Sequence, residues 1–354
     1  MIERAPIDAP GNEELEVSDG AMLPQSPVVS VLMITYNHGE YLAEAIEGVL
    51  AQQCDFPFEL IIGEDASADH TLQVALDYQR RYPGIVRVVH GPRNVGINAN
   101  GLRVYQRARG KYLAFCEGDD FWCAPGKLAG QVALLEADET IGIVHTDWTK
   151  AVNTDGRWRY DRANSVHRRV AGRFLRGDLS GTWHFPKILR TCTVMVPRTI
   201  FQAMVDSGLY RPEFRFGDSI LNAFVTAQWN VGYLPDVTAV YRVSPNSALR
   251  SGAAERVTLY RSCLAFDDEA RHLFHSRTGY APGYRWEIAV SLLFWGMRAR
   301  DWSAVRQALR EIRSRFTSRE NLACLATAVA MRWPAFHGRL RKGSERGLMD
   351  GGSQ

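Results

Sequence analysis

Two kinds of pattern alternate along the first 150 residues. Short apolar runs rich in β-branched side chains, as strands buried on both faces require, lie at residues 28–34, 58–62, 85–90, 112–116 and 141–145. Between them, apolar positions recur at the three- and four-residue spacing of amphipathic helices, at residues 41–50, 72–82, 97–109 and 127–137. This alternation predicts βαβ units, and therefore an α/β fold with a mostly parallel sheet flanked by helices.

The fourth apolar run ends in an acidic turn, with Glu117, Asp119 and Asp120 placed around Gly118. Carboxylates at the end of a buried strand repel one another unless a positive charge lies among them. Mg²⁺ or Mn²⁺ would supply that charge, because hard cations prefer oxygen ligands and keep coordination positions open for phosphate oxygens. The alternative is a plain turn, since Gly-Asp-Asp also suits a loop.

Polar residues also follow the first two apolar runs, as Thr35-Tyr36-Asn37 and Glu64-Asp65. In a parallel sheet of this kind, ligands bind beyond the carboxyl ends of the strands. The three polar strand ends are therefore expected to converge. This convergence favours a metal–phosphate site over a simple turn.

Composition and charge set the wider frame. The chain has 354 residues, 46% of them hydrophobic, enough for one large domain and an appendage. Its six cysteines lack paired spacing, which predicts reduced thiols in a cytoplasmic protein. Residues 1–26 have no apolar signal region and are expected to be disordered. The apolar stretch 288–297 is too short to span a bilayer, which takes about 20 residues.

The order and spacing of the motifs resemble the inverting glycosyltransferases of family 2, which have the GT-A fold. The resemblance runs from about residue 28 to 245 and rests on Thr35-Tyr36-Asn37, Glu64-Asp65-x-Ser67-x-Asp69, Arg93-Asn94-x-Gly96, Glu117-x-Asp119-Asp120, Gly217-Asp218 and Tyr241-Arg242. It implies a GT-A domain at 27–250, with a nucleotide-binding half at 27–147 and an acceptor half at 148–250. A helical extension at 251–335 and a basic flexible tail at 336–354 are expected to follow.

The resemblance also implies a nucleotide-binding surface. In the family, residues after the first strand line the base pocket, which here means Thr35, Tyr36 and Asn37. The acid ending the second strand, here Asp65, hydrogen-bonds the base. The loop formed by Arg93, Asn94 and Gly96 is expected to lie near the nucleotide.

The family's Asp-x-Asp motif holds a divalent metal on the nucleotide diphosphate. Glu117, Gly118 and Asp119 match it, with Asp120 adjacent, so Glu117, Asp119 and Asp120 are the expected metal ligands. Glu117 departs from the family pattern, because it keeps the charge but lengthens the arm.

The catalytic base of the family corresponds to Asp218. The alternative is that Asp218 caps a helix at 219–227. Ser244 stands where relatives often have His. Any role of that His is therefore vacant here, or filled by Arg242 or another histidine.

These residues fit the chemistry of inverting transfer. A cation on the diphosphate stabilises the leaving group, and a carboxylate removes the proton of the acceptor hydroxyl. The resemblance implies a nucleotide diphosphate sugar donor, most often a UDP-sugar. It also implies a glycan or lipid-linked acceptor in cell-surface polysaccharide biosynthesis. Two alternatives stay open, a catalytically inactive nucleotide- or glycan-binding module and a sugar-nucleotide pyrophosphorylase, although residues 35–39 lack the Gly-rich basic loop of the latter.

Other polar residues have plainer interpretations. Asp69 is expected to cap the helix that follows it, and His145 and His184 are expected to be structural. The basic, aromatic segment 157–186 is expected to be an acceptor-site loop or a solvated surface. Arg and Trp together can also bind single-stranded nucleic acid, but in a near-neutral chain no nucleic-acid partner is expected.

The chain becomes helical and basic after Glu255. Residues 298–346 carry 12 Lys or Arg and 4 Asp or Glu, and residues 302–316 have the pattern of an amphipathic basic helix. We expect 302–316 to pack on the catalytic domain. The tail 332–346 is expected to make peripheral contact with the anionic inner face of the cell membrane.

Overall fold

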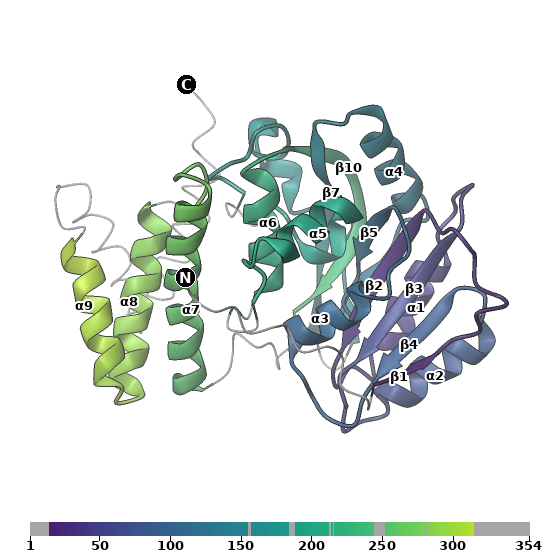
Figure 1. Ribbon diagram of the computed structural model, residues 1–354, viewed down its shortest axis with the longest axis horizontal. Helices are drawn as coiled ribbons and strands as arrows, with labels where there is room; N and C mark the ends of the chain where they lie inside the picture. Colours follow the sequence, from purple (N-terminus) through teal and green to yellow (C-terminus); the bar gives the residue numbers. More distant parts are fainter. Residues whose placement is uncertain are drawn as a thin grey trace. The chain divides into compact units, whose positions relative to one another are not determined.

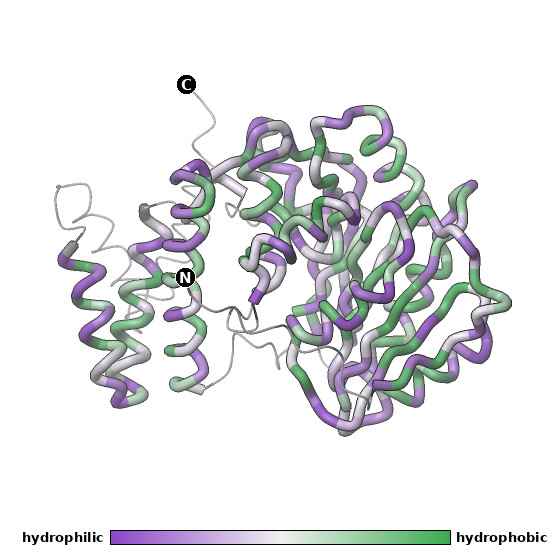
Figure 2. The backbone as a smooth tube through the Cα atoms, in the orientation of Figure 1, coloured by the Kyte–Doolittle hydropathy of each residue, from purple (hydrophilic) through white to green (hydrophobic). Residues whose placement is uncertain are grey.

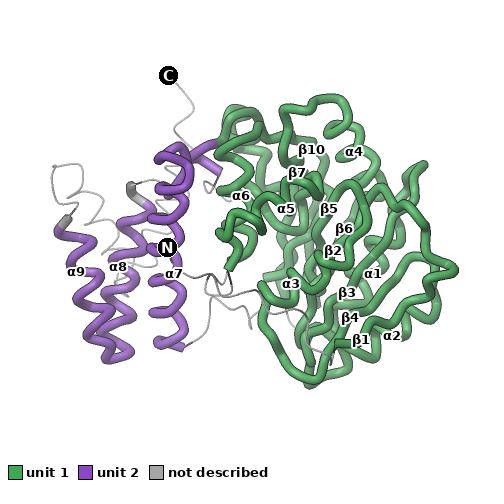
Figure 3. Tube along the Cα trace, in the orientation of Figure 1, with its two compact units in different colours: residues 1–179, 185–212, 216–244 green, residues 180–184, 213–215, 245–354 purple. Residues whose placement is uncertain are grey.

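The computed structural model (Figure 1) describes residues 14–154, 157–183, 188–211, 214, 216–243, 252–280 and 282–314. The chain divides into two compact units, coloured separately in Figure 3. Unit 1 contains residues 1–179, 185–212 and 216–244 and includes the sheet. Unit 2 contains residues 180–184, 213–215 and 245–354 and includes the C-terminal helices.

Unit 1 is built on a ten-stranded sheet with the order β1-β4-β3-β2-β5-β9-β7-β10-β6, and β8 pairs with β7 at its side. The strands are β1 Leu15–Val17, β2 Val29–Thr35, β3 Phe58–Glu64, β4 Val86–His90, β5 Tyr112–Phe115, β6 Phe121–Trp122, β7 Ile141–Thr154, β8 Arg157–Arg159, β9 Met195–Pro197 and β10 Asn230–Arg242. The pairs β2–β3, β2–β5, β3–β4 and β7–β10 are parallel. The predicted α/β fold with a mostly parallel sheet is confirmed.

Helices cover the sheet and connect its strands. In unit 1 they are α1 Leu42–Leu50, α2 Thr71–Arg81, α3 Ile97–Tyr105, α4 Lys127–Ala137, α5 Arg198–Asp206 and α6 Gly217–Thr226. Figure 2 shows the central strands coloured mainly as hydrophobic, as strands buried on both faces must be. α1 contributes Leu42, Ala45, Ile46 and Val49 to the same core, at the three- and four-residue spacing read from the sequence.

The N-terminal segment differs from its predicted disorder over residues 14–26. β1 pairs antiparallel with β4, and Glu16 of this strand forms ion pairs with Arg87 and Arg107. A three-residue strand with a central acid carries little hydrophobic signal, but pairing with β4 and ion pairs with two arginines hold it in place. Residues 1–13 lie outside the described part of the chain.

A buried acid lies at the end of the sheet where β3 begins. Glu59 accepts hydrogen bonds from Ser30 Oγ at 2.6 Å, Arg87 Nη1 at 2.9 Å and Arg109 Nη2 at 2.6 Å. The backbone amide of Arg109 adds another at 2.9 Å. The chain therefore supplies donors to both oxygens of this carboxylate.

Unit 2 contains α7 Ala253–Leu273, α8 Pro282–Arg298 and α9 Trp302–Ser314. The fully buried Asp267 pairs with Arg285 and Arg271. α9 buries Ala304 and Ala308 but leaves Trp302 63% exposed. Within the described residues, no helix has both the length and the continuous apolar character needed to cross a bilayer. The predicted tail at 332–346 lies outside the described part of the chain.

Candidate active site

Three strand ends meet at one edge of the sheet, because β3 and β5 both run parallel to β2. The amide of Asp65 donates to the carbonyl of Thr35 at 3.1 Å, and the amide of Gly118 donates to that of Ile34 at 3.0 Å. The loops after β2, β3 and β5 are therefore joined through their backbones. This is the convergence predicted from the sequence.

The first two loops are also cross-linked by side chains. Asn37 has a positive φ of 55°, and its amide side-chain oxygen accepts a hydrogen bond from the Ala68 backbone N–H at 2.8 Å. The Asn37 backbone N–H donates to Ser67 Oγ at 2.9 Å. Glu64 accepts from the amides of Ala66 and Ser67. Tyr36, between the buried Thr35 and Asn37, is exposed.

Asp65 organises the third predicted binding segment. Its two carboxylate oxygens accept from the backbone amides of Val95 at 2.8 Å and Gly96 at 2.9 Å. The side-chain amide of Asn94 also donates a hydrogen bond to the Asp65 carbonyl at 3.1 Å. Gly96 has a φ of 89°, which favours glycine, and α3 begins directly after it. Asp65 is buried, so in this structure its carboxylate holds the 94–96 loop in place.

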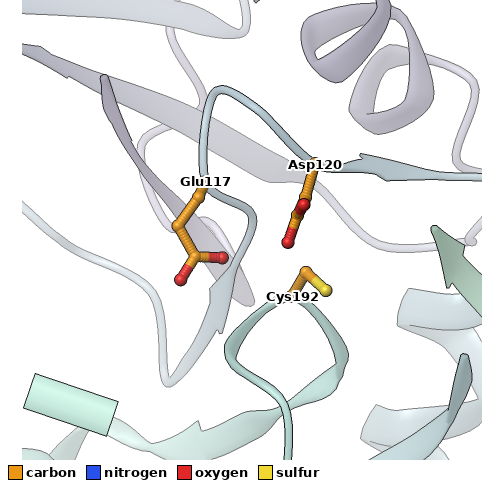
Figure 4. A group of neighbouring side chains, drawn as sticks. All are labelled: Glu117, Asp120 and Cys192. Carbon is orange, nitrogen blue, oxygen red and sulfur yellow. The ribbon is translucent and has the colours of Figure 1, made fainter. Parts of the chain in front are cut away.

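The acidic turn after β5 packs two of its carboxylates inward (Figure 4). Single ligand atoms of Glu117, Asp120 and Cys192 all lie within 4.8 Å of one another. Asp120 is only 2% exposed and accepts hydrogen bonds from the backbone amide of Arg242, at 2.9 Å, and from the Cys192 thiol. Glu117 has a hydrogen bond with the Thr191 side chain. Cys192 and Thr191 are contacts that the sequence did not reveal.

Burial and mutual repulsion perturb these acids. Burial, followed by the nearby charge of Asp119, raises the pKa of Glu117 to about 7. The same causes, with the charge of Glu117 added, raise the pKa of Asp120 well above its ordinary value. The charged forms are therefore disfavoured unless a cation joins them.

Three buried polar atoms around the turn have no hydrogen-bond partner among the residues that the structure describes: Thr35 Oγ1, His38 Nδ1 and Glu117 Oε2. The more exposed Asp119 carboxylate lies beside them, with its Oδ2 atom 4.0 Å from His38 Nε2. Unpartnered buried oxygens beside close carboxylates match the oxygen-rich donor set of a hard divalent cation. Glu117 and Asp120 therefore fit a divalent cation, whereas Asp119, also predicted as a ligand, is not a member of the close group that they form with Cys192.

Arg242 stabilises the acidic turn at residues 117–120. It donates from Nη1 to the Asp119 carbonyl at 2.8 Å, and its guanidinium lies over the rings of Phe121 and Tyr41. Its remaining ion-pair partner is Glu44. The Arg242 side chain is thus engaged by the protein, which makes it a poor substitute for the missing histidine of position 244. Ser244 itself lies outside the described residues.

Asp218 lies in the first turn of α6 and is exposed. Its Oδ1 accepts a hydrogen bond from the neighbouring Ser219 amide at 2.7 Å, and the N-cap residue of the helix is Phe216. Its charge contributes to the raised pKa of Glu117, so the two carboxylates are electrostatic neighbours. Asp218 is thus not the N-cap residue of α6, and its role as a base stays a prediction.

Other predicted residues lie elsewhere or have structural contacts. Arg93 is exposed. His145 is buried, with Nε2 2.6 Å from the Leu175 carbonyl, and burial lowers its pKa to about 3, as a structural histidine requires. His184 lies outside the described residues. A surface hollow beside β7 and β8 contains none of the predicted catalytic, nucleotide or metal residues, although part of its lining comes from the segment 157–186; it is lined by Thr149, Lys150, Val152, Arg159, Tyr160, Asp161, Asn164 and Val166.

The sequence missed His38 and Cys192 as parts of this site, and it indicated Arg242 only as a possible replacement for the histidine and not as the partner of Asp119 and Asp120. His38 belongs to the loop after β2, so its position next to Tyr36-Asn37 was an available signal. Cys192 and Arg242 reach the turn from 72 and 122 residues away along the chain, through η3 Thr191–Thr193 and the end of β10. Such long-range neighbours cannot be read from local spacing.

Residues 30–197 match the family model described as Glycosyl transferase family 2. An uncharacterized protein of Mycobacterium tuberculosis is 45% identical over 108 residues, which are 30% of this chain and 31% of that protein. A Bacillus subtilis protein named as a glycosyltransferase, EpsE, is 37% identical over 120 residues, 34% of this chain and 42% of that one. The matches thus span less than half of these relatives.

Solved structures of similar fold extend over more of the chain. S. aureus TarS, residues 1–349 in complex with UDP-GlcNAc, has a TM-score of 0.50 at 16% identity, covering 85% of this chain and 79% of that one. The mannosyltransferase PcManGT from Pyrobaculum calidifontis, in complex with GDP-Man and Mn²⁺, has a TM-score of 0.52 at 18% identity. The match covers 92% of this chain and 85% of the PcManGT chain. At these identities the likeness concerns the fold, which is that of GT-A glycosyltransferases.

Proposed function

We propose that this chain, whose residues 30–197 match the family model described as Glycosyl transferase family 2, is a glycosyltransferase that transfers a sugar with inversion from a nucleotide diphosphate sugar to an acceptor hydroxyl. One observation carries the proposal. The edge of the sheet that receives ligands holds a close group of carboxylates surrounded by unpartnered buried polar atoms, with Asp218 exposed nearby. Such a site has both kinds of carboxylate that the reaction needs, one for the cation and one for the proton.

Glu117, Asp119 and Asp120 would hold the divalent cation, Mg²⁺ or Mn²⁺. When bound, that cation neutralises the diphosphate leaving group. Arg242 keeps the turn in place by bonding the Asp119 carbonyl and the Asp120 carboxylate. Such preorganisation of charge is among the largest contributions to catalysis.

The base of the reaction is proposed to be Asp218. Its exposed carboxylate accepts the proton of the acceptor hydroxyl as that oxygen attacks the sugar carbon from the face opposite the diphosphate. A single in-line displacement inverts the configuration. The loops after β2 and β3, which carry Thr35, Tyr36, Asn37 and Asp65, are proposed to hold the nucleotide and so align donor and acceptor.

The donor is proposed to be a UDP-sugar, and the acceptor a glycan or lipid-linked saccharide of a cell-surface polysaccharide. TarS is in complex with UDP-GlcNAc, and PcManGT with GDP-Man and Mn²⁺, so proteins of similar fold bind nucleotide sugars, in one of these two cases together with a divalent ion. Calorimetric titration of UDP, GDP and dTDP, with Mn²⁺ and with chelator, tests this directly. We expect one nucleotide to bind in a metal-dependent way, and Asp119→Asn to abolish that binding. If no nucleotide binds under any condition, the site is structural.

Two other functions make different predictions. An inactive binding module would bind nucleotide without turnover, so sugar transfer by the wild type excludes it. A sugar-nucleotide pyrophosphorylase would release nucleotide sugar from a nucleoside triphosphate and a sugar phosphate, which a coupled assay detects. The loop at residues 35–39 does not favour this second reaction, because it lacks the Gly-rich basic sequence.

Peripheral membrane contact through the C-terminus is also proposed. The tail at 332–346, for which this contact was expected, lies outside the described residues; α9, which was expected to pack on the catalytic domain, also exposes apolar and cationic side chains, namely Trp302, Leu309, Arg306, Arg310 and Arg313. Such a surface suits anionic lipid. Sedimentation with anionic vesicles at low salt tests it, with neutral vesicles as control. Absence of co-sedimentation would exclude the contact.

A further inference from the structure

His38 lies beside the most exposed carboxylate of the acidic turn. Its Nε2 atom is 4.0 Å from Asp119 Oδ2, and the two side chains are 25% and 29% exposed. This distance exceeds that of a hydrogen bond, so the two groups are neighbours without being directly bonded. Both are accessible enough to receive a ligand between them.

The position of His38 is fixed by rigid parts of the fold. Its backbone amide donates to Thr71 Oγ1 at 2.9 Å, and its carbonyl accepts from the amides of Tyr41 and Leu42 at the start of α1. The ring approaches the turn closely because Gly118 has no side chain. A Cβ at position 118 would lie 3.1 Å from His38 Nδ1 and 2.6 Å from Thr35 Oγ1.

Two other nitrogen groups near the turn are directed elsewhere. Arg242 bonds the Asp119 carbonyl and pairs with Glu44. Lys127 is fully buried, bonds Gln131 and lies over the ring of Trp122 at 4.3 Å. Neither directs its charge at the Asp119 carboxylate, whereas His38 Nε2 does approach it.

We propose that His38 Nε2 and the Asp119 carboxylate bind the same divalent cation. This inference rests on the proposed function, because the cation is the one that would accompany the nucleotide diphosphate. Two atoms bound to one such cation at about 2.0–2.1 Å can lie up to about 4.2 Å apart, which includes the observed separation. Imidazole nitrogen suits Mn²⁺ better than Mg²⁺, which demands oxygen ligands, so His38 would also favour the softer ion.

Buried polar atoms support a ligand at this place. Thr35, itself almost completely buried, directs an unpartnered Oγ1 toward Gly118, and Glu117 Oε2 is unpartnered on the same turn. A cation with its bound phosphate oxygens and water would bring partners to these atoms. The turn is therefore better explained as a site that takes a ligand than as a closed structural cluster.

Pulsed electron paramagnetic resonance on the full chain with Mn²⁺ and, in separate samples, UDP, GDP and dTDP tests the proposal without measuring turnover. A directly bound imidazole gives a nitrogen coupling on the Mn²⁺ signal. We expect this coupling in the wild type and its loss in His38→Gln, with Mn²⁺ binding weakened at least about 10-fold. His70→Gln is the matched control, because its ring packs on the neighbouring Gly39 and is exposed.

The outcomes separate this inference from the proposed function. If Mn²⁺ and nucleotide bind to the wild type without nitrogen coupling, His38 is not a ligand, although the donor site stands. Coupling that survives in His38→Gln also overturns the proposal. If no nucleotide binds with Mn²⁺, the proposed function fails and the inference fails with it. Circular dichroism of each variant verifies that it is folded.

Discussion

Glu59 and the turn at residues 117–120 place buried carboxylates at opposite ends of one sheet, but the chain surrounds them with different partners. At the start of β3, Glu59 receives donors from Ser30, Arg87 and Arg109. After the end of β5, Glu117 keeps an unpartnered oxygen. The nearest charges it meets are those of other acids.

The difference appears in the direction of the pKa shifts. Burial alone would raise the pKa of Glu59, but hydrogen bonds from Arg109 and Ser30, with the charge of Arg87, lower it overall. At Glu117, burial and the charge of Asp119 both raise the pKa. A buried acid whose charge is balanced within the chain serves the fold. One whose charge is left unbalanced indicates a ligand that the chain does not contain.

The largest effect is expected from Asp218→Asn, which removes the exposed carboxylate that is proposed to act as the catalytic base. The variant should lose about 10²–10⁴-fold in sugar transfer while its metal-dependent nucleotide binding stays unchanged, because a general base acts only in the chemical step. Turnover of donor sugar and calorimetry on the same sample measure the two quantities. Asp236→Asn, another exposed acid, is the control. Equal losses in both variants would remove Asp218 from the mechanism.

The next effect concerns stability at the other end of the sheet. Glu59→Gln should lower the free energy of unfolding by about 3–5 kcal/mol, because it leaves the buried Arg87 without its charge partner. Glu117→Gln, measured at neutral pH with chelator, should cause no such loss, since it removes a repelled charge. Urea unfolding of both variants measures the contrast. Similar destabilisation by the two substitutions would contradict it.

The sequence predicted features that depend on residues close together in the chain better than features that depend on residues far apart. Local periodicity located the strands and helices of 27–147, and α4 begins and ends at the predicted residues 127 and 137. β10 was not predicted, because Pro235 and Asp236 interrupt its apolar pattern. Its long parallel pairing with β7 nevertheless holds it in the sheet.

For the site, the sequence predicted which acids follow which strands but not how each is used. Asp65 was expected at the nucleotide base, and the structure shows it bonded to the amides of Val95 and Gly96. His38 was visible only as part of a loop, since its approach to Asp119 depends on a turn 80 residues later. Contacts of this kind come from strand order, which local patterns do not encode. The assignment of Asp218 as base, and the acceptor half at 148–250, stay predictions.

Measuring stability as a function of pH distinguishes Glu117 from Glu59, because their pKa shifts have opposite signs. In the protein without metal, the pKa of Glu117 is raised to about 7, so the folded state binds more protons between about pH 4.5 and 7. Its contribution to stability therefore falls as the pH rises through that range. The pKa of Glu59 is lowered, so its contribution is present above its unfolded value and is lost as the pH falls through its folded value.

Unfolding free energies of the wild type, Glu59→Gln and Glu117→Gln, measured with chelator from pH 4 to 8, test these signs. Relative to Glu117→Gln, the wild type should become less stable as the pH rises. Relative to Glu59→Gln, it should become less stable as the pH falls below about 4.5. Curves that run parallel for all three proteins would show that neither acid titrates differently in the folded state.

The smallest effect is expected at an acid that is neither buried nor part of the site. Asp69 was predicted to cap the helix after it; the N-cap residue of α2 is His70, and Asp69 directly before it accepts from the Thr71 amide at 3.0 Å. Its Oδ2 accepts from the Gly39 amide at 3.0 Å, which ties the loop after β2 to the same helix. Asp69→Ala should therefore cost about 1 kcal/mol of unfolding free energy, as loss of a helix cap does.

The second bond of Asp69 makes this substitution informative about the site. If the loop after β2 depends on it, Asp69→Ala should also weaken nucleotide binding, because Gly39 follows His38 directly. Asp69→Asn keeps an oxygen acceptor and should restore most of the stability. Unchanged nucleotide affinity in Asp69→Ala would mean that Thr71, which bonds the His38 amide, holds the loop without help. Asp69 would then resemble Glu59, as a carboxylate that stabilises the fold without affecting the site.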